Sequence, residues 1–183
     1  YVSSSRHRRK QTASPPIPTA KTPSNAKPVI STATLIETST VPESSFSVPP
    51  LNSAQNMAYS NSKQIAHEKF KSGDYSGSLE NYLNASHVIP ETNPLQIILF
   101  SNISLVYSKL GNPKEQLVYA DKGLDLISSN SNNASISDLS KFFIEDNKSM
   151  RSFWIKLMMK RAEALEFLEK WKDSKEAYEK LIS

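Results

Sequence analysis

The chain has 183 residues, of which 38% are hydrophobic and 22% are charged, and it contains no cysteine. The lack of cysteine excludes disulfide scaffolds, zinc fingers and thiol catalysis. The formal net charge of +4 is uneven, because residues 1–55 carry six Lys or Arg against two Glu, whereas residues 56–183 carry sixteen of each sign. The basic excess therefore belongs to an N-terminal arm rather than to a folded face, and we expect no nucleic-acid partner.

Residues 1–55 hold eight of the eleven prolines and eighteen Ser or Thr. Such a segment has too little apolar surface to offset the entropy lost on ordering, so we predict a disordered linker. Within it, the run from Arg6 to Lys10 is interpreted as a solvated basic patch. No apolar run approaches the roughly 18 residues of a membrane span, and no signal peptide is recognisable, so we expect a cytoplasmic chain without a transmembrane segment.

A first helix pair is predicted over residues 56–90. Apolar residues recur there at three- and four-residue steps, and the pattern is broken at Gly73. Asp74 is suited to cap the second helix, and Pro90 follows its last turn because proline cannot continue a helix.

A second pair is predicted over residues 93–128, with Pro94 in its first helical turn and Gly111 at its internal turn. Lys-Ser-Gly-Asp-Tyr at the first turn and Lys-Leu-Gly-Asn-Pro at the second repeat one pattern. A recurring helix-turn-helix pattern indicates stacked repeats whose function lies on a surface.

Residues 129–151, rich in Ser and Asn, are predicted to be an insertion, since they exceed a normal connection within a helical array. The stretch 138–144 is compatible with a helical turn packed on a neighbour or with a mobile loop. A third pair is predicted over 152–183, in which we expect Trp154 and Trp171 to be packed. Because the sequence begins at Tyr1 and stops within a helical pattern, we expect it to be a piece of a longer protein.

The helix pairs resemble tetratricopeptide repeats, which need small residues where helices cross. Small residues occupy the corresponding places in all three pairs: Ala66, Ser78, Ala85, Ser104, Ala120, Gly123, Ala162 and Ser174. Gln116 replaces a small residue, which predicts a looser crossing. The resemblance implies an all-α superhelix of about three helix pairs preceded by the linker.

In this family the first helix of each pair lines a concave wall, so residues one turn apart look into a common groove. Lys ammonium groups and an Asn amide there would suit a peptide carboxylate. The pattern resembles the carboxylate clamp of chaperone-binding tetratricopeptide domains, which implies binding of the acidic C-terminal tail of a 70-kDa or 90-kDa heat-shock chaperone. The candidate clamp residues are Lys63, His67, Asn102, Lys109, Lys156 and Lys160. His67 stands where Asn is usual, a change expected to weaken the clamp or alter its pH response.

A closer resemblance, over roughly residues 57–183, is to the tetratricopeptide region of fungal auxilin-like proteins. It lies in Phe-Lys-Ser-Gly-Asp-Tyr-Ser-Gly-Ser-Leu, in Pro-Leu-Gln-Ile-Ile-Leu-Phe-Ser-Asn-Ile and in Trp-Ile-Lys-Leu-Met-Met-Lys-Arg-Ala-Glu-Ala-Leu-Glu. This resemblance implies a role in clathrin-coat disassembly and vesicle traffic, at coated vesicles or the endoplasmic reticulum. Clathrin binding and a J domain would then belong to other parts of the parent protein.

An enzyme is the class that the residues favour least, and no metal or cofactor is expected, because no nucleophile set or metal-spaced ligand pair is present. Glu163 and Glu166, three residues apart, are interpreted as part of a charged outer helix face. Two other interpretations stay open. The chain could be a scaffold that contacts clathrin or another trafficking protein, or a co-chaperone domain of the 90-kDa class.

Overall fold

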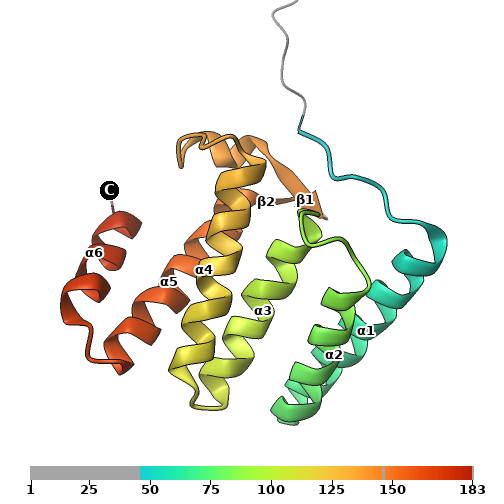
Figure 1. Cartoon of the computed structure of the whole chain (residues 1–183), viewed down its shortest axis with the longest axis horizontal. Helices are drawn as coiled ribbons and strands as arrows, with labels where there is room; N and C mark the ends of the chain where they lie inside the picture. The colour runs from blue at the N-terminus through green and yellow to red at the C-terminus, as the bar shows by residue number, and fades with distance from the viewer. Residues whose placement is uncertain (1–45, 146, 183) are drawn as a thin grey trace, which may run out of the picture. The chain divides into compact units, whose positions relative to one another are not determined.

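The computed structural model of the chain describes residues 46–145 and 147–182, and this part is mostly helical (Figure 1). The expected all-α class is confirmed. The basic run from Arg6 to Lys10 and most of the predicted linker lie outside the described residues. The elements are α1 (Ser53–Lys71), α2 (Tyr75–His87), α3 (Leu95–Lys109), α4 (Pro113–Asn130), a short 3-10 helix η1 (Asp138–Lys141), β1 (Phe143–Glu145), β2 (Lys148–Ser149), α5 (Met150–Phe167) and α6 (Trp171–Ile182).

Consecutive helices pack against each other as the pairs α1 and α2, α3 and α4, and α5 and α6 (Figure 1). Successive pairs are joined by contacts between α2 and α3 and between α4 and α5, and α3 also contacts α5 directly. The first helices of the second and third pairs are therefore neighbours, although 55 residues of chain separate their starting points at Leu95 and Met150.

Side-chain caps fix where three of the helices begin. The Asn52 side chain accepts a hydrogen bond from the Gln55 amide in a full capping box, so α1 starts at Ser53, before the boundary predicted at residue 56. Asp74 caps α2 through the amide of Gly77, as expected from the sequence. Asn112 caps α4 in the same way, with proline in the first helical turn.

The turns inside the first two pairs depend on glycine. Gly73 has a φ of 85° and Gly111 a φ of 68°, values that residues with a Cβ rarely adopt. Each follows the end of a helix and lets the chain reverse. The third pair uses Glu169 instead, at a φ of 60°, which a non-glycine residue adopts only at some cost in strain.

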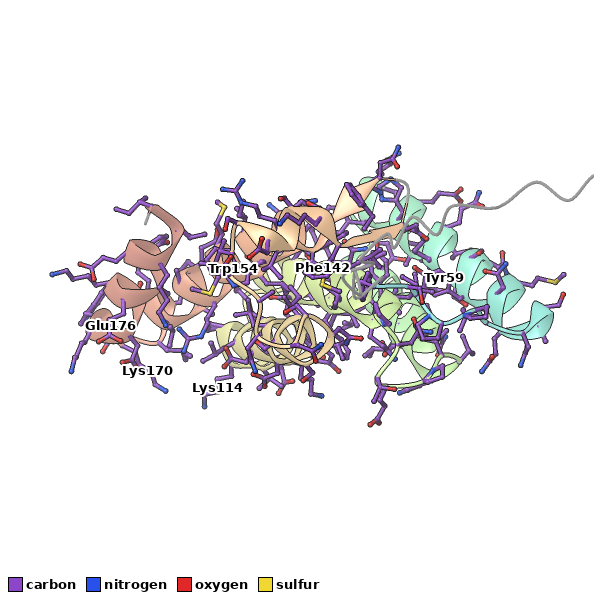
Figure 2. All side chains as sticks on the ribbon, turned by 90° about the horizontal axis from the view of Figure 1, so that it is seen from above. Tyr59, Lys114, Phe142, Trp154, Lys170 and Glu176 are labelled. Atoms are coloured by element: carbon purple, nitrogen blue, oxygen red, sulfur yellow. The ribbon has the colours of Figure 1, made fainter. Side chains whose placement is uncertain are left out.

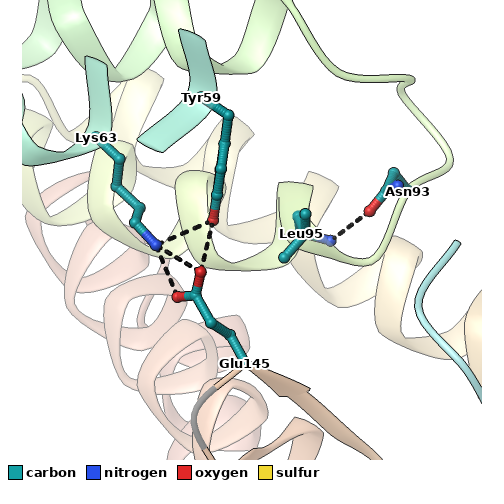
Figure 3. Close-up of polar contacts among 5 residues, drawn as sticks. All are labelled: Tyr59, Lys63, Asn93, Leu95 and Glu145. Atoms are coloured by element: carbon teal, nitrogen blue, oxygen red, sulfur yellow. Dashed lines mark hydrogen bonds and ion pairs between the residues drawn. The ribbon is translucent and has the colours of Figure 1, made fainter. Parts of the chain in front are cut away.

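The described residues before α1, which begin at Phe46, are also packed. The Phe46 ring meets the Phe142 ring edge to face at 5.4 Å between centroids. The buried Asn93 side chain donates to the Pro49 carbonyl at 3.1 Å. It also accepts from the Leu95 amide at 3.0 Å (Figure 3). The segment from residue 46 onward is thus part of the folded unit, although the sequence suggested linker as far as residue 55.

The core follows the helix pairs. Tyr59 and Ala66 of α1 are buried together with Leu99 and Ile103 of α3, so these two first helices share one cluster. A second cluster joins α3 to α5, and a third joins α5 to α6. The second contains Ile97, Ile98, Phe153 and Leu157, and the third contains Met158, Ala162, Leu165 and Ala177.

The insertion is ordered and packed where it is described. Leu139 in η1 is 2% exposed and Ile144 in β1 is 7% exposed, and both belong to the α3–α5 core cluster. Of the two alternatives left open for residues 138–144, the packed helical turn is the one observed. The β1–β2 hairpin that follows was not expected, and Asn147 in its turn has a φ of 59°.

Two packing expectations were wrong. The crossing at Gln116 is not loose, because this side chain is 1% exposed and its amide donates to the Lys160 carbonyl at 2.8 Å. A long polar side chain fills the crossing by bonding to the neighbouring helix. Trp171 is not packed but 62% exposed, at the first position of α6.

None of the helices in the described residues combines the length and apolar character that a bilayer-spanning helix requires.

Candidate peptide-binding face

The six candidate clamp residues lie on the first helices of the three pairs. Lys63 and His67 are on α1, Asn102 and Lys109 are on α3, and the two lysines 156 and 160 are on α5. Each pair lies on one helix at a spacing of four or seven residues, which keeps both members near one helix face. That all six face one groove stays a prediction.

The six candidate residues differ in their exposure to solvent. His67, Lys109 and Lys156 are exposed, whereas Lys63, Asn102 and Lys160 are partly buried. Within the described part of the chain, no hydrogen bond or ion pair joins two of the six to each other, as expected for mainly cationic side chains. The Lys156 ammonium lies 5.3 Å from the centre of the Phe153 ring, a cation–π distance that leaves it accessible.

The most specific contact on this face is between Lys63 and Glu145. The Lys63 Nζ donates to both carboxylate oxygens of Glu145, at 2.6 and 2.7 Å (Figure 3). The Tyr59 hydroxyl donates to the same carboxylate at 3.4 Å and accepts from Lys63 at 3.3 Å. A carboxylate is therefore bound at one of the positions that the sequence selected for carboxylate binding.

The position of Glu145 follows from the hairpin. Ile144 is directed into the α3–α5 core, and side chains alternate along a strand, so the next residue is directed away from that core. The Met150 amide bonds to the Phe142 carbonyl at 2.7 Å and ties the base of the hairpin to the start of α5. The insertion thus places Glu145 against Tyr59 and Lys63 of α1, in the first helix pair.

The sequence did not single out Glu145. It lies 82 residues from Lys63 in a segment without helical periodicity, so no local signal pointed to it.

Lys160 also forms an ion pair within the chain. Its ammonium bonds to Glu163 at 2.8 Å, one turn along α5, and the side chains are 20% and 32% exposed. Gln116 of α4 contacts the same carboxylate at 3.4 Å. Glu163 therefore orients Lys160 and belongs to an α4–α5 network, rather than to a purely solvated outer face.

The opposite side of the second pair carries a groove of about 510 Å³ between α2 and α4. Its floor includes Gln96 and Phe100 of α3, and Lys122 lies 4.8 Å above the Tyr119 ring at its edge. Burial raises the pKa of the Tyr119 phenol, with smaller contributions from Tyr107 and Glu115. The sequence did not predict the groove, because its width depends on the distance between α2 and α4.

Two proteins with curated descriptions are similar to this chain. It is 31% identical over 137 residues to the auxilin-like clathrin uncoating factor SWA2 of Saccharomyces cerevisiae, a match that covers 73% of this chain and 20% of that protein. It is 30% identical over 134 residues to UBA domain-containing protein 7 of Schizosaccharomyces pombe, covering 73% and 18%. No protein-family model matches the chain.

The expected similarity to auxilin-like proteins is confirmed at the level of sequence. The chain spans about a fifth of the length of the curated relatives it matches. The similarity therefore concerns a part of each relative and not its whole length.

Proposed function

We propose that the chain is a tetratricopeptide-type binding module that receives the C-terminal carboxylate of an acidic peptide on the face formed by α1, α3 and α5. The natural ligand would be the tail of a 70-kDa heat-shock chaperone, within an auxilin-like factor for clathrin-coat disassembly. The module itself would bind and position its partner, and carry out no covalent chemistry.

The helix crossings support the repeat assignment. Ala66, Ala85 and Ala120 are all fully buried, and Ser104 and Ser174 are buried with their hydroxyls bonded to the neighbouring helix. Close crossings of this kind, repeated in each pair, are what the tetratricopeptide pattern requires.

The observation that carries the binding proposal is the bidentate contact of Lys63 with a carboxylate. Charge-assisted bonds at 2.6 and 2.7 Å are the strong kind that proteins use to hold carboxylates. The ammonium, together with the buried Tyr59 hydroxyl, already provides the donors that a peptide C-terminus needs. Lys156 and Lys109 supply further exposed positive charge for the acidic residues before that terminus.

The clathrin context is supported by the similarity to a relative described as an auxilin-like clathrin uncoating factor. A chaperone-binding face would be useful in such a factor, because coat disassembly of that type needs a chaperone held close to its substrate. A tethered chaperone is present at a high effective concentration without any new contact to the coat.

The test is a calorimetric titration of the chain with a short peptide ending in Glu-Glu-Val-Asp and with its C-terminally amidated form. We expect the free acid to bind in the micromolar range, about 8 kcal/mol. The amide should bind much more weakly, and added salt should reduce binding because partly exposed charge pairs are screened. Equal binding of both forms, or of neither, would contradict the proposal.

Single substitutions locate the site. Lys156→Ala should weaken binding of the free acid, because this exposed ammonium has no acidic partner on its own helix in the described structure. Lys114→Ala is the matched control: it also removes one exposed lysine, but from α4, away from the first helices (Figure 2). Equal losses in the two variants would indicate general charge attraction rather than a site.

A further inference from the structure

The carboxylate that occupies Lys63 belongs to the chain itself. Both oxygens of Glu145 are within 2.7 Å of the Lys63 Nζ, and the Tyr59 hydroxyl completes the contact. The ammonium also lies 4.7 Å from the centre of the Tyr59 ring, which covers one side of it. When a peptide carboxylate approaches, the Lys63 ammonium is therefore already hydrogen-bonded to Glu145 and Tyr59.

Both carboxylates cannot share Lys63 without a penalty. Two like charges about 4 Å apart repel each other even in water, and more strongly where the protein lowers the local dielectric response. The Lys63 and Glu145 side chains are only 26% and 23% exposed, so solvent screens this place incompletely. Peptide binding at Lys63 should accordingly require that Glu145 leaves.

The hairpin is built so that Glu145 can leave without unfolding the domain. Leu139, Ile144 and Met150 anchor the insertion in the α3–α5 core, with exposures of 2%, 7% and 0%. Glu145 lies between the anchors Ile144 and Met150, at the end of a three-residue strand next to the hairpin turn. Short strand ends open locally at much lower free energy than a core does.

We propose that the insertion is an autoinhibitory strap, in which Glu145 occupies Lys63 in place of the peptide carboxylate and must be displaced when an acidic peptide binds. This inference rests on the proposed function and adds regulation to the same site. A tethered carboxylate competes at an effective concentration in the millimolar range, so weakly acidic peptides are excluded and strongly acidic ones displace it.

The competition has a measurable size. The apparent Kd equals the intrinsic Kd divided by the fraction of molecules in which Lys63 is open. If the strap is closed in about 70 to 90% of molecules, removing its charge should tighten peptide binding about three- to tenfold.

The experiment compares the full 183-residue chain with Glu145→Gln and Glu176→Gln, using the free-acid Glu-Glu-Val-Asp peptide. Both variants remove one negative charge, but Glu176 is exposed on α6 (Figure 2), so it controls for general attraction to an acidic ligand. Glu145→Gln should bind about three- to tenfold more tightly than the unmodified chain, and Glu176→Gln should stay within about twofold of it. Glu145→Ala should reproduce the gain if the glutamine amide retains some contact with Lys63.

A Lys63→Ala background tests whether the gain in affinity comes from competition for Lys63. There the Glu145→Gln substitution should bring no gain, because the group for which the two carboxylates compete is gone. If the unmodified chain prefers the free acid but neither Glu145 variant binds it more tightly, the strap is structural and the inference is wrong while the proposed function stands. If no variant distinguishes the free acid from the amide, the proposed function fails, and the inference with it.

Discussion

Gly123 of α4 lies directly against the side chain of Leu157 of α5. A Cβ atom at Gly123 would be 2.7 Å from the Leu157 Cδ1 and 2.8 Å from its Cδ2, both far inside van der Waals contact. Leu157 is 0% exposed, so its methyl groups have no free space to move into. The close approach of the second and third helix pairs therefore depends on the absence of a side chain at position 123.

Gly123→Ala should lower the free energy of unfolding by about 1 kcal/mol. Alanine gains about 0.5 to 1 kcal/mol in helix propensity, but forcing a methyl group into a filled core costs about 1 to 3 kcal/mol. Urea unfolding followed by circular dichroism measures the difference. In a Leu157→Ala background, where about 2 to 5 kcal/mol has already been lost to a cavity, the same substitution should become neutral or stabilising. A loss of equal size in both backgrounds would show that the contact does not limit packing.

Asp74 should make the stability of the domain depend on acid pH. The Lys69 ammonium, which bonds to its carboxylate at 2.8 Å, and the Gly77 amide hold the pKa of Asp74 below its ordinary value. A lowered carboxylate pKa contributes stability above the unfolded-state pKa of about 4 and loses it as pH falls through the folded-state pKa. Asp74→Asn keeps the capping oxygen but not the charge, so it should reduce Tm at pH 7 less than Asp74→Ala does. The difference in Tm between the unmodified chain and Asp74→Asn should become smaller in thermal scans as the pH is lowered from 5 to 2.5. A difference in Tm that stays constant over this pH range would show that the Asp74 charge does not contribute to stability.

Trp171→Ala should leave the free energy of unfolding nearly unchanged, because 62% of the side chain is exposed. Phe153→Ala is the matched aromatic deletion in the same helix pair. Phe153 is 3% exposed and belongs to the α3–α5 core cluster, so its loss should cost about 3 to 5 kcal/mol. Chemical unfolding of both variants compares them directly. A large loss for Trp171→Ala would mean that this side chain is covered in solution.

The features that the sequence predicted well are local ones. Gly73 and Gly111 mark turns because their backbone conformation requires glycine, and Asp74 marks a helix start because a carboxylate caps the next turn. Such signals act over three or four residues and can be recognised without knowledge of the fold. The same register placed Lys63 and Asn102 on the first helices, where the structure has them.

The features that it missed depend on contacts between distant segments. The Lys63–Glu145 contact requires a particular hairpin register in an insertion without periodicity. Gln116 was judged by size alone, but its amide finds acceptors on α5 that only the packed helices provide. For Trp171, an aromatic residue at a turn suggested burial, yet burial depends on whether a neighbouring element covers that turn.

Three buried serines lie at helix crossings. Ser104 donates its hydroxyl to the Gln116 carbonyl at 2.9 Å, and Ser174 donates to the Ala162 carbonyl at 3.0 Å. Ser78, at the equivalent crossing of the first pair, is also fully buried, but its hydroxyl has no hydrogen-bond partner among the described residues. A buried hydroxyl without a partner costs about 1 to 3 kcal/mol relative to its solvated state.

Ser78→Ala should therefore raise the free energy of unfolding by about 1 kcal/mol, because it removes the unsatisfied group and improves helix propensity. Ser104→Ala is the control with the same change in volume, and it should lower stability by about 1 kcal/mol, since it leaves a buried carbonyl with one bond fewer. Urea unfolding of the two variants gives opposite signs if hydrogen bonding decides the outcome. Shifts of the same sign would mean that the serine volume, or a bound water at Ser78, decides it instead.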